Sequence, residues 1–262
     1  MSAPDRGNAP VLAVERLSKS FGGVQAVDAV SFTLQSGELL ALIGPNGAGK
    51  TTCFNMLNGQ LKADIGSVRL NGQEISGLAP ERIWRRGVGR TFQITATFAS
   101  MTVRENVQMA LISHHRRDKA LWRPAASLYV EAADALLDRV GMKAQAERAC
   151  GVLAYGDIKR VELAVALANE PKLLLMDEPT AGMAPRERIE LMALTAEIVR
   201  ERDIAVLFTE HDMDVVFAHA DRIMVLDRGR LIAEGKPEQV RADKQVQDIY
   251  LGTGAVHGVE VG

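Results

Sequence analysis

The stretch that decides the fold is a glycine-rich segment that overlaps the end of a continuous apolar run at 38–44. It reads, in order, Gly44, Pro45, Asn46, Gly47, Ala48, Gly49, Lys50, Thr51 and Thr52. The segment fits the pattern GxxxxGK(S/T), in which glycines let successive backbone N–H groups point inward at phosphates. A helix that begins directly after the loop adds a favourable dipole. The sequence therefore predicts a strand, a phosphate-binding loop and a helix, with Lys50 on the β- and γ-phosphates and Thr51 as a Mg²⁺ ligand.

A second acidic motif follows another apolar run. The residues LLLM at 173–176 lead into Asp177, Glu178 and a proline. Ligands of a parallel sheet gather at the carboxyl ends of its strands, so Asp177 is expected beside Thr51, where it can hold Mg²⁺ through water. Glu178 is then placed to polarise an attacking water as a general base. An acid after a strand is commonly just a turn residue, but the phosphate-binding loop favours the functional interpretation.

The rest of the chain alternates between strand-like and helical patterns. Short apolar segments typical of strands occur at 11–14, 24–27, 31–34, 38–44, 173–176 and 204–209. Hairpins are predicted within 68–75, turning at Asn71-Gly72, and within 223–235, turning at Arg228-Gly229. This alternation predicts an α/β fold with a largely parallel sheet.

Helical patterns fill two long stretches, at about 95–165 and 185–202. The first contains a capping box, Thr102-Val-Arg-Glu105, and a helix predicted over 127–142 that stops at Gly141. The charged run at 114–119 is interpreted as a solvated loop or helix face. Residues 1–10 and 253–262 are expected to be tails around a single domain at 11–252, into which the helical stretch is inserted.

Composition narrows the function further. The 262 residues are 47% hydrophobic and 24% charged, the ordinary globular mix, which excludes a disordered chain. A formal charge of −2 and a pI near 6.2 argue against nucleic acid as a partner. Apolar runs fall short of the ~18 residues of a membrane span, and the polar N-terminus lacks a signal-peptide pattern, so a cytoplasmic protein is expected.

Several residue types have only a structural interpretation. Cys53 and Cys150 match no metal or redox spacing and are expected to be reduced thiols. Histidines without a motif partner are expected at the surface: His114, His115, His219 and His257. Methionines such as Met176, Met183 and Met192 are expected to pack in the core or to fill gaps at contacts between elements.

Further motifs stand in a fixed order around the two phosphate-site motifs. They are RTFQ at 90–93, LAYGD at 153–157, AGMAP at 181–185 and FTEHD at 208–212. Together the set resembles the nucleotide-binding subunits of ABC transporters, from about residue 11 to 250. The resemblance implies a P-loop NTPase of the ABC type, with a RecA-like core, an N-terminal antiparallel β subdomain and an inserted α-helical subdomain.

The same resemblance implies roles for individual residues toward ATP and Mg²⁺. Gln93 stands at the place of the family's Q-loop glutamine, which implies a catalytic and a metal-binding role, and His211 stands at the place of the switch histidine, also a catalytic residue. Phe21 stands where an aromatic ring stacks on adenine. The signature residues Ala154, Tyr155, Gly156 and Asp157 would contact ATP held by a second subunit. Taken alone, Gln93 could be a loop residue, His211 a satisfied polar residue and Phe21 part of the core.

The sequence departs from the family pattern in two places. Ala154 replaces the usual signature serine, Tyr155 and Asp157 also differ from LSGGQ, and Ala184 replaces an acidic or amide residue after the second motif. Backbone donors at a helix N-terminus could still hold a γ-phosphate. These changes bear on turnover and not on the fold.

More narrowly, RTFQ, the AYG signature, the EHDM string and the charged insert resemble the branch that energises uptake of branched-chain and other hydrophobic amino acids. The resemblance implies transmembrane permease subunits, a second ATP-binding subunit (copy or paralogue) paired head-to-tail, and indirectly a periplasmic or extracellular substrate-binding protein. The protein would lie peripherally on the cytoplasmic side of the plasma (inner) membrane. We expect the segment at 94–110 to dock on the permease, with Phe98, Met101 and Val103 as contact candidates, unless these residues pack internally.

Alternatives remain open at this point. Importer ATPases for urea, amides or aromatic acids would look alike. A cytosolic ABC ATPase acting on nucleic acid or ribosomes is disfavoured by the net charge of −2 and the single nucleotide-binding unit. A regulatory module without turnover is suggested by Ala154 and Ala184. The residues that argue against it are the intact Lys50, Asp177, Glu178 and His211.

Overall fold

A six-stranded sheet carries the predicted phosphate site in the computed structural model of the chain, which describes residues 9–91, 97–115 and 127–252. Its strands lie in the order β10-β9-β3-β8-β7-β6. Their bounds are Leu39–Ile43 (β3), Val88–Thr91 (β6), Leu173–Asp177 (β7), Ala205–Thr209 (β8), Arg222–Asp227 (β9) and Arg230–Gly235 (β10). Neighbours pair in parallel except β9 and β10, which form the predicted hairpin at the edge. The largely parallel sheet is confirmed.

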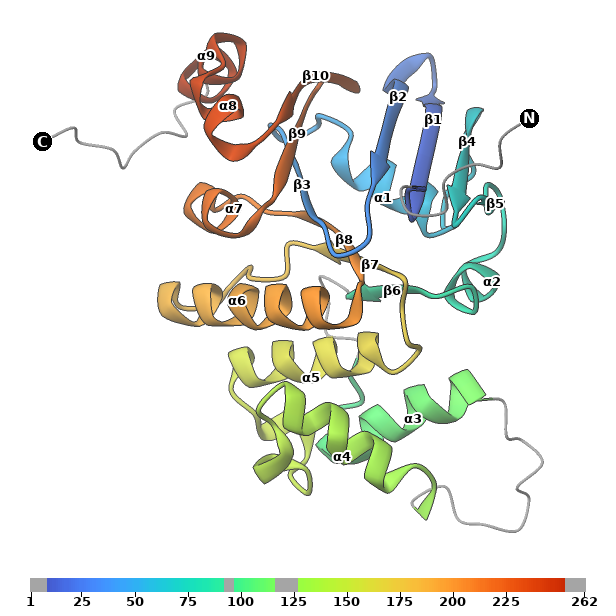
Figure 1. Ribbon diagram of the computed structural model, residues 1–262, viewed down its shortest axis with the longest axis vertical. Coiled ribbons are helices and arrows are strands. Elements are labelled where there is room, and N and C mark those ends of the chain that lie inside the picture. Colours follow the sequence, from blue (N-terminus) through green and yellow to red (C-terminus); the bar gives the residue numbers. More distant parts are fainter. Residues whose placement is uncertain (1–8, 92–96, 116–126, 253–262) are drawn as a thin grey trace, which may run out of the picture.

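A second, antiparallel sheet is built from the N-terminal part of the chain in the order β2-β1-β4-β5. Its strands span Leu12–Phe21 (β1), Val24–Leu34 (β2), Ile65–Leu70 (β4) and Gln73–Glu74 (β5). Asn71 and Gly72 both have positive φ, 48° and 75°, as the predicted two-residue hairpin turn requires. Figure 1 shows this sheet in blue and teal, to one side of the larger one.

Two of the predicted N-terminal strands are in fact one. The apolar segments at 24–27 and 31–34 belong to the single strand β2, and β1 continues past 14 to Phe21. Irregularities explain the broken pattern: Arg16 and Ala29 have φ of 50° and 51°, and the register shifts between Val14 and Leu17. A bulge adds a residue and moves the later side chains to the other face, so the alternation is interrupted while the strand continues.

Nine α-helices of the described residues pack on the sheets or on one another. Their bounds are Lys50–Leu57 (α1), Pro80–Trp84 (α2), Val103–His115 (α3), Val130–Arg139 (α4), Tyr155–Leu167 (α5), Pro185–Arg202 (α6), Met213–His219 (α7), Pro237–Ala242 (α8) and Lys244–Gly252 (α9). The capping box is present, since Thr102 and Glu105 exchange hydrogen bonds of 2.7 and 3.2 Å. The helix predicted over 127–142 is shorter, because Tyr129 adopts a left-handed conformation before it and Gly141 after it.

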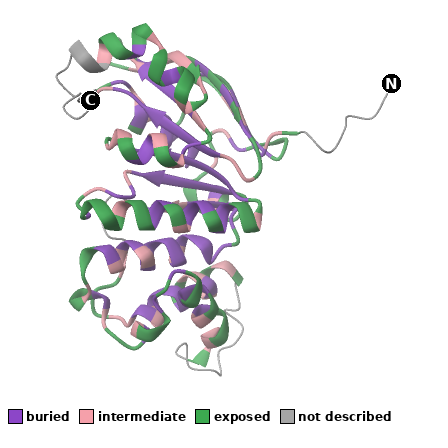
Figure 2. Ribbon diagram, turned by 60° about the vertical axis from the view of Figure 1, so that its left-hand side comes forward, coloured by how far each residue is buried: buried purple, intermediate pink, exposed green. Residues whose placement is uncertain are grey.

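The large sheet divides the apolar core into two. Leu39, Ala41 and Ile43 of β3 face one cluster, which also contains residues of α3, α4, α5 and α6. Leu40 and Leu42 face the other, which contains α1 and the small sheet. Figure 1 shows the result as layers, with α6, α5 and then α3 and α4 below the strands of the large sheet, and Figure 2 shows these strands in purple, as buried. The strand alternation therefore places α1 and α5 on opposite faces of the sheet.

Other structural predictions have mixed outcomes. Met176, Met183 and Met192 are buried, and the thiols of Cys53 and Cys150 are buried and unpaired, as predicted. Of the histidines expected at the surface, His115 is exposed, and His114 and His219 are partly buried at the ends of α3 and α7. Burial and Arg200 lower the pKa of His219. Most of the charged run at 114–119, and His257, lie outside the described residues. Among the helices in the described ranges, none is both long and apolar enough to cross a membrane.

Candidate functional site

The loop at 44–49 connects β3 to α1 at the carboxyl edge of the large sheet. Gly47 and Gly49 have φ of 80° and 105°, which favour glycine. At Gly49 a Cβ atom would lie 2.4 Å from the carbonyl oxygen of Ala26, and at Gly44 one would lie 2.2 Å from that of Leu226. The neighbouring backbone thus excludes side chains from these two positions. Tight curls of this kind can direct successive N–H groups at an anion. The N–H of Ala48 donates within the loop, to the carbonyl oxygen of Pro45 at 3.1 Å.

The side chain of Lys50, the first residue of α1, folds back over this loop. Its Nζ donates to the carbonyl oxygens of Gly44 and Pro45 at 2.7 and 3.1 Å. Burial lowers the pKa of Lys50, while the nearby carboxylates of Glu178 and Asp177 act in the opposite direction. The loop, the ammonium and both acids of the second motif therefore share one small region, as the sequence predicted.

Asp177 is the last residue of β7, and both of its carboxylate oxygens face neighbouring strands. Oδ1 accepts a hydrogen bond of 2.8 Å from the hydroxyl of Thr209, the last residue of β8. Oδ2 lies 3.8 Å from a guanidinium nitrogen of Arg90 on β6. The sequence reasoning assigned no role to Thr209 or Arg90. For Thr209 the usable signal was its place at the end of an apolar strand, whereas Arg90 lies inside the short strand β6, which the sequence did not predict. The strand order was needed to see that the two residues meet at Asp177.

Glu178 is held in an unusual backbone conformation next to His211. Its φ is 49°, and its N–H is within 3.2 Å of the backbone oxygen and 3.1 Å of the hydroxyl of Thr209. A left-handed conformation costs a residue with a side chain ~1–2 kcal/mol. Oε1 lies 2.8 Å from Nε2 of His211, whose side chain is 52% exposed. Two predicted catalytic residues from separate motifs are thus in direct contact.

A buried carboxylate connects this contact to the loop that follows Glu178. Glu210 accepts hydrogen bonds from the backbone N–H and the hydroxyl of Thr180, at 2.8 and 2.6 Å, and from the N–H of His211 at 3.2 Å. Charge-assisted hydrogen bonds of this kind offset the cost of burying a carboxylate. Glu210 fixes the two loops relative to each other, and the sequence reasoning missed it.

The signature residues lie at the start of α5, across the sheet from the phosphate-binding loop. Ala154 and Tyr155 are exposed, and Gly156 is buried. A Cβ atom on Gly156 would lie 3.1 Å from the carboxyl carbon of Glu187, which caps α6. The carboxylate of Asp157 accepts a hydrogen bond of 3.1 Å from Gln145. Within one chain, these residues do not meet Lys50.

Two further residues were predicted to contact ATP or Mg²⁺, Phe21 and Gln93. Phe21 ends β1 and is 49% exposed, so the alternative that it belongs to the core is wrong. Its ring centre lies 5.6 Å from Nζ of Lys19. Gln93 lies outside the described residues.

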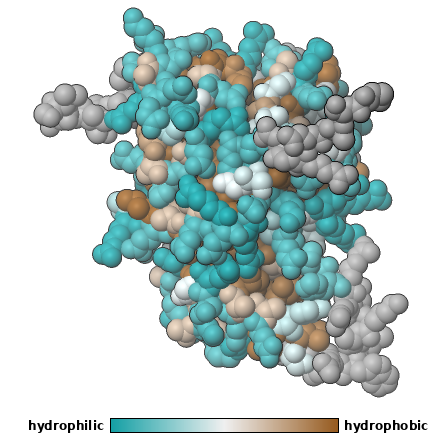
Figure 3. Space-filling view, in the orientation of Figure 1, coloured by the Kyte–Doolittle hydropathy of each residue, from teal (hydrophilic) through white to brown (hydrophobic). Residues whose placement is uncertain are grey.

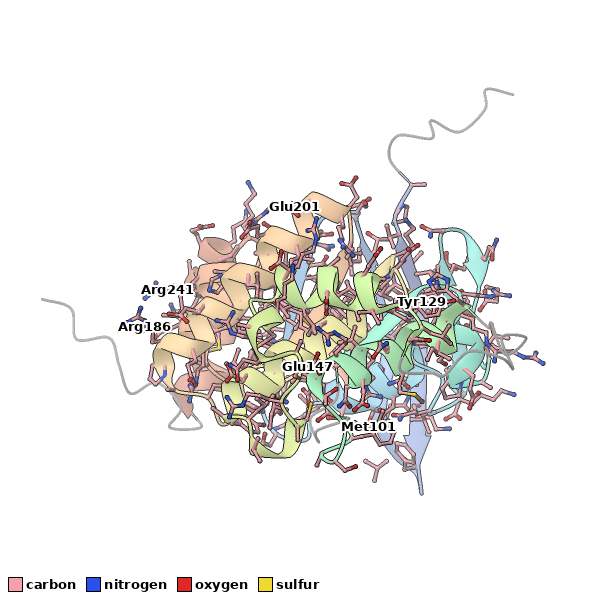
Figure 4. The ribbon with its side chains drawn as sticks, turned by 90° about the horizontal axis from the view of Figure 1, so that it is seen from below. Met101, Tyr129, Glu147, Arg186, Glu201 and Arg241 are labelled. Atoms are coloured by element: carbon pink, nitrogen blue, oxygen red, sulfur yellow. The ribbon has the colours of Figure 1, made fainter. Side chains whose placement is uncertain are left out.

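The three residues predicted to dock on the permease differ in their exposure. Phe98 is 57% exposed and Met101, labelled in Figure 4 on the loop that enters α3, is partly exposed. Val103 is fully buried, so its prediction as a contact residue is wrong. It begins α3 and faces the core cluster between α3, α4 and α5.

Comparison with known proteins decides the family. The profile of the ABC transporter family matches residues 27–181. The chain belongs to the ABC transporter family. As an ABC transporter ATP-binding subunit it binds nucleotide, is an ATPase and works with membrane permease subunits. A second profile, described as branched-chain amino acid ATP-binding cassette transporter, matches residues 230–256 of this subunit.

Individual relatives of the ATP-binding subunit match over nearly its whole length. The high-affinity branched-chain amino acid transport ATP-binding protein LivG of Salmonella typhimurium is 40% identical over 253 residues, 93% of this chain and 98% of the relative. BraF of Pseudomonas aeruginosa, described in the same words, is 39% identical over the same shares. A crystal structure of an ATP-binding cassette of an ABC transporter in its ADP conformation aligns with a TM-score of 0.84 at 33% identity, covering 94% of this chain and 100% of that one.

Proposed function

We propose that this subunit hydrolyses MgATP to drive uptake of branched-chain or other hydrophobic amino acids through separate permease subunits. The names of LivG and BraF and the match of the C-terminal segment to a branched-chain amino acid family support the substrate class. The substrate itself contacts other subunits. The nucleotide site alone would serve an importer of urea, amides or aromatic acids equally well.

One observation carries the proposed chemistry, the 2.8 Å contact between Oε1 of Glu178 and Nε2 of His211 at the edge that holds Lys50. Glu178 takes a proton from the attacking water as general base, and His211 orients Glu178 and the γ-phosphate. Lys50 and the loop N–H groups bind the β- and γ-phosphates. The strain of the left-handed Glu178 is in keeping with a functional position.

The donor set at this edge fits a Mg²⁺ ion. Thr51, the second residue of α1, is exposed and supplies a hydroxyl, and Asp177 supplies a carboxylate. Hard oxygen ligands of this kind suit Mg²⁺, and Gln93 would add an amide oxygen. When bound, the ion neutralises phosphate charge during transfer.

The ATP site is completed by a second ATP-binding subunit, either a copy or a paralogue, in a head-to-tail pair. The signature residues 154–157 lie at the start of α5, which packs on the face of the sheet opposite to α1, where Lys50 lies. We therefore expect the signature of a second subunit, and not that of the same chain, to contact the γ-phosphate. Ala154 and Tyr155 are exposed and available to a partner. Because Ala154 has no hydroxyl, the γ-phosphate would be held there by N–H groups at the start of α5.

The partner surfaces and location follow from the same assignment. Phe98, 57% exposed on the loop before α3, is a contact candidate for the permease. The face of the molecule drawn in Figure 3 is mostly hydrophilic, with apolar side chains between the hydrophilic ones. The subunit would lie on the cytoplasmic side of the inner membrane, with a substrate-binding protein acting through the permease on the other side. We further propose that 11–252 form one domain with a helical subdomain at about 95–165.

Glu178→Gln tests the proposed chemistry. The amide keeps the reach of the side chain toward His211 but cannot accept a proton. ATP binding should persist, phosphate release should slow ~10²–10⁴-fold, and ATP should give a long-lived dimer in size-exclusion chromatography with the partner subunit. Glu197→Gln, the same change on an exposed position of α6, is the matched control. Turnover near wild type without an ATP-dependent dimer would contradict the mechanism.

The substrate class needs a separate measurement. Cells that lack the chain should lose high-affinity uptake of labelled leucine, and the wild-type gene should restore it. Unchanged leucine uptake together with lost urea or amide uptake would favour the alternative importers.

A further inference from the structure

Arg90 stands beside the metal-binding edge of the site without a part in the chemistry proposed above. It lies on β6, three positions before Gln93. Pairing places Arg90 opposite Leu175 on β7, so that it shares a sheet face with Asp177 two residues further on. One guanidinium nitrogen lies 3.8 Å from Oδ2 of Asp177, and another donates to Oε1 of Gln60 at 2.6 Å. The side chain is 14% exposed.

The position of this cation matters because the edge is otherwise rich in negative charge. Asp177 and Glu178 both reach the region of Lys50 and act on its pKa. An incoming nucleotide adds the charge of its phosphates. The arginine stays charged at any working pH, so it compensates the carboxylate of Asp177 permanently.

We propose that Arg90 is a positioning residue that neutralises and orients Asp177 whenever no divalent cation is bound. In this role Arg90 lets the loop accept the nucleotide phosphates before, or without, a metal ion. Thr209 fixes Oδ1 of the same carboxylate at 2.8 Å, so the two side chains together set its orientation. The inference rests on the proposed function, because it presupposes that MgATP binds at this edge.

A neutral residue at position 90 therefore has an effect that depends on the metal. Without Mg²⁺, the charge of Asp177 faces the phosphates uncompensated and ATP binds more weakly. With Mg²⁺, the metal supplies the missing positive charge and the affinity for ATP changes little. Repulsion between the uncompensated carboxylate of Asp177 and the ATP phosphates, partly screened by solvent, corresponds to about a fivefold loss of affinity for metal-free ATP. A residue with only a structural role would change both affinities alike.

The experiment measures ATP binding to the full-length chain by calorimetry, once in excess EDTA and once in excess Mg²⁺. Arg90→Met should weaken binding about fivefold in EDTA and less than twofold in Mg²⁺. Arg90→Lys keeps the charge and should restore most of the affinity in EDTA. Arg85→Met, a change at an exposed position at the end of α2, is the matched control and should alter neither affinity. Arg90→Gln supplies a second neutral variant if the methionine variant does not fold.

The outcomes separate the two claims. Equal losses in EDTA and Mg²⁺, or a lysine variant that behaves like the neutral ones, would overturn the role of Arg90 while leaving the ATP site intact. A wild-type chain that binds ATP under neither condition would instead overturn the proposed function, and this inference with it.

Discussion

Thr209→Val should destabilise the protein although it changes one buried hydroxyl to a methyl group of similar size. The hydroxyl of Thr209 donates to the carboxylate of Asp177 at 2.8 Å, and Thr209 is 1% exposed. Losing a hydrogen bond to a buried charged group costs ~1.5–3 kcal/mol. The N–H of Glu178 keeps a partner, because the backbone oxygen of Thr209 also lies within 3.2 Å, so no second penalty is added.

The assay is thermal unfolding of the apo chain, supported by urea titration. In a chain of this size, 1 kcal/mol shifts the Tm by ~2–4 °C, so a fall of about 3–12 °C is expected. Thr209→Ser keeps the hydroxyl and should recover most of the loss. ATP hydrolysis should also fall in the valine variant, because Asp177 is no longer oriented. A Tm within 1 °C of wild type would refute the hydrogen bond as a stabilising contact.

Three further predictions concern other parts of the chain. Lys50→Ala should abolish tight ATP binding through loss of a charge-assisted contact of ~1.5–3 kcal/mol, and unchanged affinity by calorimetry would contradict the phosphate-loop assignment. Burial raises the pKa of Cys53 to about 12 and also raises that of Cys150, so a thiol reagent at pH 8 should label neither thiol in the native chain and both in urea; fast native labelling would count against the buried thiols. Ala154→Ser should be tolerated and modestly raise turnover in the assembled complex, since it adds a donor where phosphate oxygens are expected; a collapse of activity would indicate a different loop structure.

Much of the fold could be predicted from the sequence because turns, buried strands and helix ends depend on residues that are close together in the chain. The loop at 44–52 requires its glycines, the hairpin at Asn71-Gly72 requires positive φ, and the helix predicted over 185–202 appears with the same bounds. Continuous apolar runs correctly predicted the fully buried strands β3, β7 and β8. The strand lengths in the small sheet were wrong where bulges interrupt the alternation.

The contacts around Asp177 could not be predicted in the same way. Arg90, Asp177 and Thr209 come from strands that are neighbours in the order β6-β7-β8 but are separated by long stretches of chain. The sequence pattern gave the ends of β7 and β8, but it predicted no strand at β6 and could not show which strands lie side by side. Val103 shows the same limit: its apolar side chain fits a contact patch or a core equally well, and only the packing of α3 on α4 and α5 decides.

The segment from Thr180 to Glu187 connects the region of the Glu178–His211 contact to the start of α5, where the proposed signature residues lie. At one end, Thr180 is held by Glu210, whose carboxylate also receives the N–H of His211. At the other end, Glu187 packs against Gly156, the buried glycine of the signature. These contacts fix both ends of a short run of chain that lies between the Glu178–His211 contact and the start of α5. In the proposed dimer, a partner subunit that contacts the signature residues would therefore bind next to a segment that is linked to Glu178 and His211 of the same chain. Because positions 154 and 184 are alanines, this link would depend on backbone groups and packing instead of side-chain hydrogen bonds.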